Sequence, residues 1–96
     1  MGYLSSVLIV RPWMKKSIHT REQQRLQILL RKIRAEADLT QQALGQRLHL
    51  PQSFVSKYES GERMLDVMEL RNVCNALGVC FPEFAKRLEK ELSDAS

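Results

Sequence analysis

The chain has 96 residues, of which 44% are hydrophobic and 27% charged, a composition typical of one small globular domain. The net charge is +4, and the basic excess lies in the first part, where residues 1–37 hold eight basic and two acidic side chains. Residues 38–63 are neutral and residues 64–96 are acidic overall. A one-sided positive charge suits a nucleic acid or an anionic membrane surface, but it specifies neither partner.

Apolar runs and cysteines exclude several classes of protein. No stretch approaches the roughly 18 apolar residues of a membrane span, so we expect no membrane partner. The run at 4–10, Leu-Ser-Ser-Val-Leu-Ile-Val, is short and lacks the preceding basic residues of a secretory signal. Cys74 and Cys80 are too far apart for a Cys-x-x-Cys pair and have no histidine beside them. We therefore expect free thiols, no metal and a cytoplasmic protein.

Sequence signatures of catalysis are missing. The chain has two histidines, His19 and His49, and no Gly-rich phosphate loop, His-Glu-x-x-His motif or nucleophile elbow. The acidic residues near the end, such as Glu89 and Glu91, follow a helical pattern whose charged face is normally solvated. We expect neither an enzyme nor a cofactor.

Residues 1–17 form an N-terminal extension that differs from the rest of the chain. Residues 7–10 have the composition of a strand, but a lone strand finds no partner in a helical domain. A disordered arm, a cloning remnant or an early start codon before Met14 would each explain the segment. The alternative is an arm that pairs with its copy in a dimer or reaches DNA through Arg11, Lys15 and Lys16.

A first helix is predicted from Thr20 to about 37–38. Thr20 and Gln23 have the spacing of a capping box, which marks a helix start. Apolar residues then recur at helical spacing and predict one buried stripe, made of Leu26, Leu29, Leu30, Ile33 and Ala37.

Two short helices follow. Thr40 is an N-cap candidate for a helix over 41–48, with its oxygen available to the amide of residue 42 or 43 and with Leu44 and Leu48 buried. Pro51 suits the first turn of the next helix, over about 52–59, because its missing N–H is not needed there. Val55 and Tyr58 face the core of that helix, and Gly61 ends it in a left-handed conformation.

Two more helices complete an all-α bundle of about five, a domain that we place over residues 18–96. Asp66 and Glu69 form a second capping-box pattern, and Gly78 ends that helix. Its buried stripe is Leu70, Val73, Cys74 and Leu77. The last helix begins near Pro82, and its apolar face carries Phe84, Leu88 and Leu92.

The segment at residues 39–63 carries the functional signal. It contains two short helices joined by about three residues, and the second is rich in Gln, Ser and Lys, side chains that bond to base edges and phosphates. Helices joined in this way cross steeply, so that one enters a major groove while the other braces it.

This segment resembles the helix-turn-helix of the phage repressor/Cro-like (Xre) family of bacterial DNA-binding proteins. The densest match is Leu-Thr-Gln at 39–41 and Val-Ser-Lys-Tyr-Glu-Ser-Gly at 55–61, and the resemblance extends over about residues 26–88. It implies a five-helix, lambda-repressor-like domain that forms a homodimer on double-stranded DNA. Transcriptional control at a two-fold symmetric operator, with 52–59 as the recognition helix, is also implied.

The resemblance assigns roles residue by residue. Gln41 corresponds to a glutamine that touches a phosphate, while Gln52 and Ser53 occupy the turn that reads bases. Phe54 either presses a thymine methyl or turns into the core. The complete set expected to contact DNA is Gln41, Gln52, Ser53, Phe54, Ser56, Lys57, Ser60 and Arg63.

Arg34 and Glu59 correspond to a structural ion pair that orients the motif. The chain also departs from the family pattern. Gly45 replaces an alanine, which suits a close helix contact but weakens the helix by about 1 kcal/mol. His49 replaces a glycine at a site that often needs a positive φ, which implies strain. Pro51 replaces the usual Ser or Thr cap, which leaves the first amides of the helix for water or a phosphate.

We interpret the chain as a dimeric repressor acting on a palindromic operator. Two alternatives within the same fold stay open. One is an antitoxin or another protein-interaction module with a toxin partner, and the other is a restriction–modification controller protein. The apolar 4–10 arm and the surface formed by Phe81, Phe84 and Leu88 would be the evidence for the interaction module.

Overall fold

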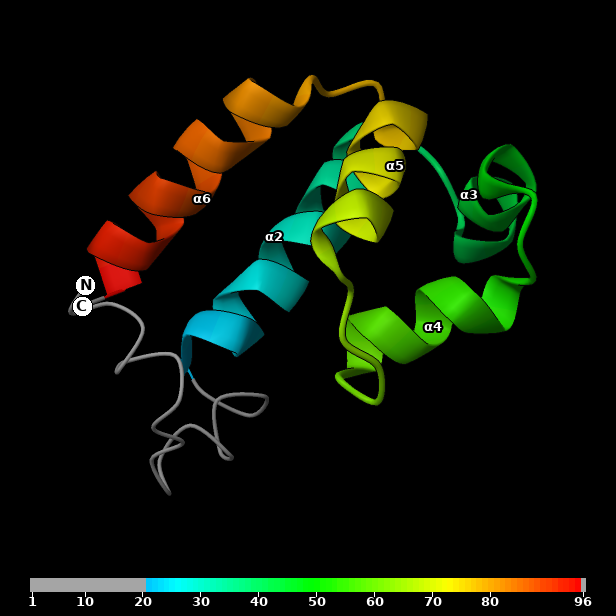
Figure 1. The fold of residues 1–96 in the computed structure, drawn as a ribbon, viewed down its shortest axis with the longest axis horizontal. Coiled ribbons are helices and arrows are strands. Elements are labelled where there is room, and N and C mark those ends of the chain that lie inside the picture. Colours follow the sequence, from blue (N-terminus) through cyan, green and yellow to red (C-terminus); the bar gives the residue numbers. More distant parts are fainter. Residues whose placement is uncertain (1–20, 96) are drawn as a thin grey trace, which may run out of the picture.

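The computed structural model describes residues 21–95, which form five α-helices without a strand. The labels follow Figure 1, and the bounds are α2 (Arg21–Glu36), α3 (Gln41–Leu48), α4 (Gln52–Ser60), α5 (Val67–Leu77) and α6 (Phe81–Ala95). The predicted all-α bundle is therefore confirmed for this part of the chain. The extension at 1–17 and the Thr20 capping box lie outside the described residues.

The five helices pack around one core, and the first of them, α2, packs against the last, α6. Figure 1 shows α2 and α6 side by side on one side of the molecule, with α3 and α4 on the other. The α3 helix packs most extensively on α4, and α5 packs on α3 and α6. One buried cluster unites all five helices: Leu29, Leu30, Ile33, Leu44, Val55, Tyr58, Val73, Cys74, Leu77 and Phe84.

Local signals place most of the helix ends where the sequence predicts them. The Thr40 side chain accepts a hydrogen bond from the amide of Ala43 at 3.0 Å. Asp66 and Glu69 form both bonds of a capping box, at 2.7 and 3.0 Å. Gly61 and Gly78 end α4 and α5 with φ of 89° and 80°, in the left-handed region that favours glycine.

Three details of the predicted helices are wrong. Ala37 is exposed, because α2 ends at Glu36 and Asp38 turns the chain with φ 60°, so that Leu39 packs on the core instead. Pro51 is the N-cap of α4 and does not lie in its first turn, since its ψ of 156° is extended. Leu26, Leu48 and Leu70, which were expected in buried stripes, lie at the edge of the core and are only partly buried.

Ion pairs join the first and last described helices. Arg87 of α6 donates two hydrogen bonds to Glu36 of α2, at 3.0 and 3.2 Å. Lys32 and Glu91 approach to 3.7 Å on the same pair of helices. Between residues 21 and 95, no helix has the length and apolar character needed to cross a bilayer.

Candidate nucleic-acid interface

The turn between α3 and α4 sets how these two helices meet. His49 adopts φ 59° and ψ 37°, as the sequence predicts, and its amide bonds to the carbonyl of Gln46 at 3.1 Å. The amide of Leu50 then bonds to the carbonyl of Gly45 at 2.9 Å. A Cβ on Gly45 would lie 2.8 Å from the Leu50 oxygen, so glycine permits the close approach of α3 to the turn. The turn carries the chain from α3 into α4 in three residues (Figure 1).

The α4 helix has one buried face and one polar, exposed face. Val55, Tyr58 and Glu59 are buried, which fixes the side that faces the core. The opposite side exposes four polar residues and leaves a fifth, Ser56, half-buried; the exposed ones are Gln52, Ser53, Lys57 and Ser60.

Two of these polar residues differ in their local bonding. Lys57 makes no ion pair or hydrogen bond through its side chain to any residue between 21 and 95. The Ser60 hydroxyl donates to the carbonyl of Lys57 at 3.1 Å, which is a bond inside α4. The ammonium of Lys57 is therefore available to a partner from outside this part of the molecule, and Ser60 keeps only its acceptor capacity.

A buried carboxylate lies behind this face. Glu59 is 2% exposed, and both of its oxygens accept from Arg34 of α2, at 2.7 and 3.0 Å. Arg34 also donates to the carbonyl of Leu39 at 2.8 Å. The hydrogen bond to Glu59 raises the pKa of Arg34, so the guanidinium stays charged. The pair that the family resemblance implies is thus a bidentate one between α2 and α4.

Arg31 is a second arginine at this site, and no role was predicted for it from the sequence. It donates to the backbone carbonyl of Glu59 at 3.1 Å, and its Nε lies 3.9 Å from the carboxylate. Its position one turn before Arg34 on α2 is the signal that could have indicated this contact. Arg31 is 57% exposed, so it also presents charge to solvent near the end of α4.

Gln41 links the buried carboxylate to the exposed face. Its Nε2 donates to Glu59 at 2.9 Å, and its Oε1 accepts from Nε2 of Gln52, also at 2.9 Å. From the family resemblance, we expect Gln41 to touch a phosphate. The structure instead uses both ends of its carboxamide inside the protein, although the side chain is only partly buried.

Phe54 turns inward, which is the second of the two orientations considered for it. Its ring packs on the core and meets Tyr58 edge-on, with the ring centroids 5.7 Å apart. The guanidinium of Arg63 covers the ring at 4.7 Å. The ring is partly buried, so its packing agrees with the inward orientation, and a base contact by Phe54 stays a prediction.

Arg63 is engaged inside the protein as well. It donates two hydrogen bonds to Glu69 of α5, at 3.0 and 2.6 Å, and one to the carbonyl of Met64. The bond from Arg63 is the main reason why the pKa of Glu69 is lowered. These contacts oppose the predicted role of Arg63 in binding the DNA backbone, because its charge is already paired.

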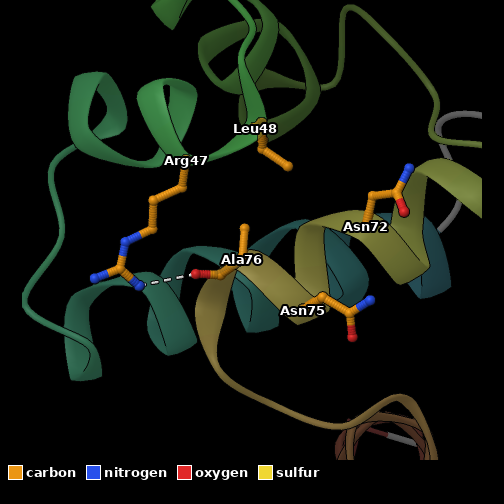
Figure 2. A pocket seen from close by; sticks show the side chains of 5 residues that line it. All are labelled: Arg47, Leu48, Asn72, Asn75 and Ala76. Carbon is orange, nitrogen blue, oxygen red and sulfur yellow. Dashed lines mark hydrogen bonds between the residues drawn. The ribbon is translucent and has the colours of Figure 1, made fainter.

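A groove lies beside the motif helix α3. The groove has a volume of about 390 Å³ and lies between α3 and α5. Figure 2 shows the side chains that line it, Arg47, Leu48, Asn72, Asn75 and Ala76. Arg47 points across it and donates to the carbonyl of Ala76 at 3.0 Å, near the end of α5. Among residues 21–95, no group of His, Cys, Asp and Glu has the geometry of a metal site.

Two short helices across a tight turn, the second with a polar exposed face, define a helix-turn-helix DNA-binding domain. Comparison with known proteins agrees: residues 30–84 match the model of a helix-turn-helix family. The chain belongs to the XRE family of helix-turn-helix proteins and is a DNA-binding transcription regulator.

Solved structures similar to this chain come from the same class. An XRE-family like protein from Pseudomonas syringae pv. tomato str. DC3000 is 42% identical, with a TM-score of 0.71 over 79% of this chain and 93% of that one. The wild-type restriction–modification controller protein C.Esp1396I is 26% identical, with a TM-score of 0.71 over 76% and 94%. The tetramer of that controller in complex with its natural 35 base-pair operator gives 26% identity and a TM-score of 0.70 over 75% and 95%. No curated protein matches the chain.

Proposed function

We propose that the protein is a homodimeric repressor that inserts α4 into the major groove of a palindromic operator. The observation that carries the proposal is the polar, exposed face of α4 supported from behind by the buried Glu59. A helix held in this way presents the same side chains to every site, which sequence-specific binding requires. The similar controller protein was solved on its natural operator, which supports DNA as the partner.

Individual residues on α4 have separate tasks in this proposal. Gln52 and Ser53 lie in the exposed first turn and contact base edges. Lys57 lies about one turn further along and contacts a guanine or a phosphate. Ser56 and Ser60 are proposed to contact the backbone, where a hydroxyl is sufficient. No side chain caps the start of α4 at Pro51, so its first amides are also available to a phosphate.

Dimerisation through α6 and the neighbouring region 77–84 would place two copies of α4 on one face of the DNA. Two recognition helices related by a two-fold axis reach successive major grooves when they are about 34 Å apart. The controller protein that resembles this chain was solved as a tetramer on its operator, which supports assembly on DNA. We extend the domain to residues 18–96 and regard 1–17 as an extension outside it.

In vitro selection from random duplexes, performed with the full chain, tests this function. We expect a site of two inverted half-sites whose centres are about 10 base pairs apart. A reporter gene placed behind the selected site should then be transcribed less when the protein is present. Enrichment of a single, asymmetric half-site would contradict the dimer, and increased transcription would contradict the repressor.

Gln52→Ala identifies the base that α4 reads. Binding of this variant to singly substituted sites should lose its preference at one position of each half-site, because a base-edge contact disappears. Gln42→Ala is the matched control, since Gln42 is an exposed glutamine of α3 whose side chain makes no hydrogen bond to α4, and it should leave every preference unchanged. Unchanged discrimination by Gln52→Ala would remove Gln52 from the reading surface.

A restriction–modification controller is the second candidate function. It is favoured by the solved structures of C.Esp1396I, which cover three quarters or more of this chain. The antitoxin alternative has no such support among the similar solved structures. We also propose that the protein is not an enzyme, in keeping with a family of DNA-binding regulators.

A further inference from the structure

Arg31 of α2 is an exposed arginine at the end of α4 to which the proposed function gives no role. Its NH2 group donates to the backbone carbonyl of Glu59 at 3.1 Å, and its side chain is 57% exposed. That carbonyl belongs to the last turn of α4, which ends at Ser60. One hydrogen bond therefore fixes the guanidinium against α4 while much of its surface remains open to solvent.

The positive charge of Arg31 is not neutralised by the groups around it. Arg34 already pairs with both carboxylate oxygens of Glu59, at 2.7 and 3.0 Å. Nε of Arg31 lies 3.9 Å from the same carboxylate, which is too long for a hydrogen bond. Two arginines thus share one buried carboxylate, which leaves one positive charge in excess. Because the Arg34 side chain is only 16% exposed, Arg31 presents this excess charge to solvent.

This charge lies close to the exposed face of α4. The carboxylate oxygen 3.9 Å from Arg31 is Oε1 of Glu59, and the same oxygen accepts from Gln41 at 2.9 Å. Gln41 bonds in turn to Gln52, in the exposed first turn of α4. Lys57, the exposed cation of that face, precedes by two residues the carbonyl that Arg31 binds. The guanidinium is therefore a near neighbour of the side chains that border the α4 face.

We infer that Arg31 binds a phosphate of the DNA backbone beside the major groove that α4 enters. A guanidinium has five N–H donors in a planar fork, which suits the oxygens of a phosphate. Arg31 uses one donor on Glu59, and its other N–H groups have no acceptor among residues 21–95. A helix in the major groove has a sugar–phosphate backbone on either side, so a cation beside that helix is placed to meet a phosphate.

The contact extends the DNA-binding surface from the helix-turn-helix to α2. It rests on the proposed function, because it requires α4 to lie in the major groove. The bond to the Glu59 carbonyl holds the guanidinium in place before DNA arrives, which reduces the entropy lost on binding. Phosphate contacts fix the position of a protein on the duplex and carry no base information. Arg31 therefore contributes to affinity and salt dependence but not to base preference.

The salt dependence of operator binding by the full chain tests this contact. Arg31→Met keeps an aliphatic side chain and removes the charge. We expect the slope of log K against log salt concentration to become less steep by about 0.9 for each protomer bound to the selected operator. Arg71→Met is the matched control, because Arg71 is an exposed arginine of α5 with no side-chain bond to any residue between 21 and 95. The control should leave the slope unchanged.

Operators that carry single methylphosphonates locate the contact, because each replaces one charged phosphate oxygen by a methyl group. Neutralising a phosphate that the parent protein contacts should weaken binding. At one phosphate of each half-site, Arg31→Met should lose no further affinity, because both partners of one interaction have been removed. At the other contacted phosphates the two losses should add.

Two further variants separate charge from support of the fold. Arg31→Gln removes the charge but keeps an N–H donor for the Glu59 carbonyl, and it should reproduce the change in slope. Arg31→Lys keeps the charge and should restore the slope of the parent. Thermal melting should show all three Arg31 variants folded at the binding temperature. If Arg31 only secures the end of α4, Arg31→Met will lower the melting temperature and leave the slope unchanged, which overturns the inference.

The remaining outcomes distinguish this inference from the proposed function. An equal change of slope for Arg71→Met would reduce the effect to net charge and overturn the phosphate contact. Base preferences are a separate readout, and Arg31→Met should keep those of the parent. If Gln52→Ala leaves every base preference unchanged, the reading role of α4 fails. If Gln52→Ala relaxes one position while Arg31→Met leaves the slope unchanged, the phosphate contact alone is overturned.

Discussion

Gly45 and Tyr58 show how single positions control the packing behind the α4 surface. Gly45 is buried where α3 meets the turn, and the backbone oxygen of Leu50 occupies the space that a Cβ would need. Tyr58 is 2% exposed, and its hydroxyl has no hydrogen-bond partner among the described residues. At Gly45 the neighbouring backbone leaves no room for a side chain. At Tyr58 a buried hydroxyl lacks a hydrogen-bond partner among the described residues.

Gly45→Ala should therefore destabilise the protein, although alanine is the better helix former by about 1 kcal/mol. The new Cβ would lie 2.8 Å from the Leu50 oxygen, and the backbone of the turn would have to move. Because overpacking costs about 1–3 kcal/mol, we expect a net loss of about 1 kcal/mol in denaturant unfolding. Gln46→Ala, an exposed change on the same helix, is the control and should be nearly neutral. A gain in stability for Gly45→Ala would show that the turn yields easily.

Tyr58→Phe should stabilise the protein, in contrast to Gly45→Ala. Removing an unsatisfied buried hydroxyl abolishes its desolvation penalty while the ring keeps its edge contact with Phe54. We expect the free energy of unfolding to rise by about 1 kcal/mol, measured by thermal melting. Tyr58→Leu, which removes the ring as well, should lower it. A destabilised Tyr58→Phe variant would mean that the hydroxyl has a partner in solution.

At the scale of elements, the start of α5 is held by one shared carboxylate. Glu69 accepts from the amide of Asp66 and from the guanidinium of Arg63, so it serves the capping box and the preceding loop together. The loop is also fixed to α4, because Arg63 covers the ring of Phe54. The connection between α4 and α5 is thus ordered by side chains for which the sequence predicts separate roles, DNA contact for Phe54 and Arg63 and helix capping for Glu69.

Acid should weaken this connection. Arg63 lowers the pKa of Glu69 below its ordinary value of 4.5, so the folded state binds this proton more weakly than the unfolded chain does. The stabilising contribution is complete above pH 4.5 and disappears as the pH falls through the lowered pKa. In unfolding experiments between pH 6 and pH 2, Glu69→Gln should reduce the acid-dependent loss of stability. Arg63→Met should do the same, and an unaltered pH profile in both would refute the role of the pair.

At the scale of the whole molecule, the buried Glu59 carboxylate of α4 connects three helices, because it bonds to side chains of α2 and α3. Arg34 comes from α2, Glu59 from α4, and Gln41 of α3 bonds to the same carboxylate. A second Arg–Glu pair, between Arg87 and Glu36, joins α2 and α6 with similar distances but at the surface. The two pairs differ in burial, and this difference decides their energetic weight.

Arg34→Met should destabilise the protein by about 3–5 kcal/mol, because it leaves the Glu59 charge buried without its main partner. Arg87→Met is the matched control and should cost less than about 1 kcal/mol, as expected for an exposed pair. Denaturant unfolding of both variants at pH 7 measures the difference. Equal losses would show that the Glu59 carboxylate finds another partner, for which Arg31 is the nearest candidate.

The sequence by itself determined the helices and the position of the helix-turn-helix at residues 39–63. Thr40, Gly61, Gly78 and the Asp66–Glu69 pair act on backbone groups within a few residues, so their effect is encoded locally. The periodicity of apolar residues likewise identified most of the core. The pairing of Arg34 with Glu59 came from the family resemblance, since no local rule connects residues 25 positions apart.

Only the tertiary structure decided which side chains of the motif are used inside the protein and which remain exposed on α4. Phe54 and Arg63 turned inward, and Gln41 was drawn between Glu59 and Gln52, because their partners lie on other helices. The +4 charge of the chain illustrates the same limit. It made nucleic acid a reasonable partner, but the described motif uses several of its charges in internal pairs, leaving Lys57 as a free cation on the exposed face of α4. Burial and pairing, which composition does not record, determine what a charge can contact.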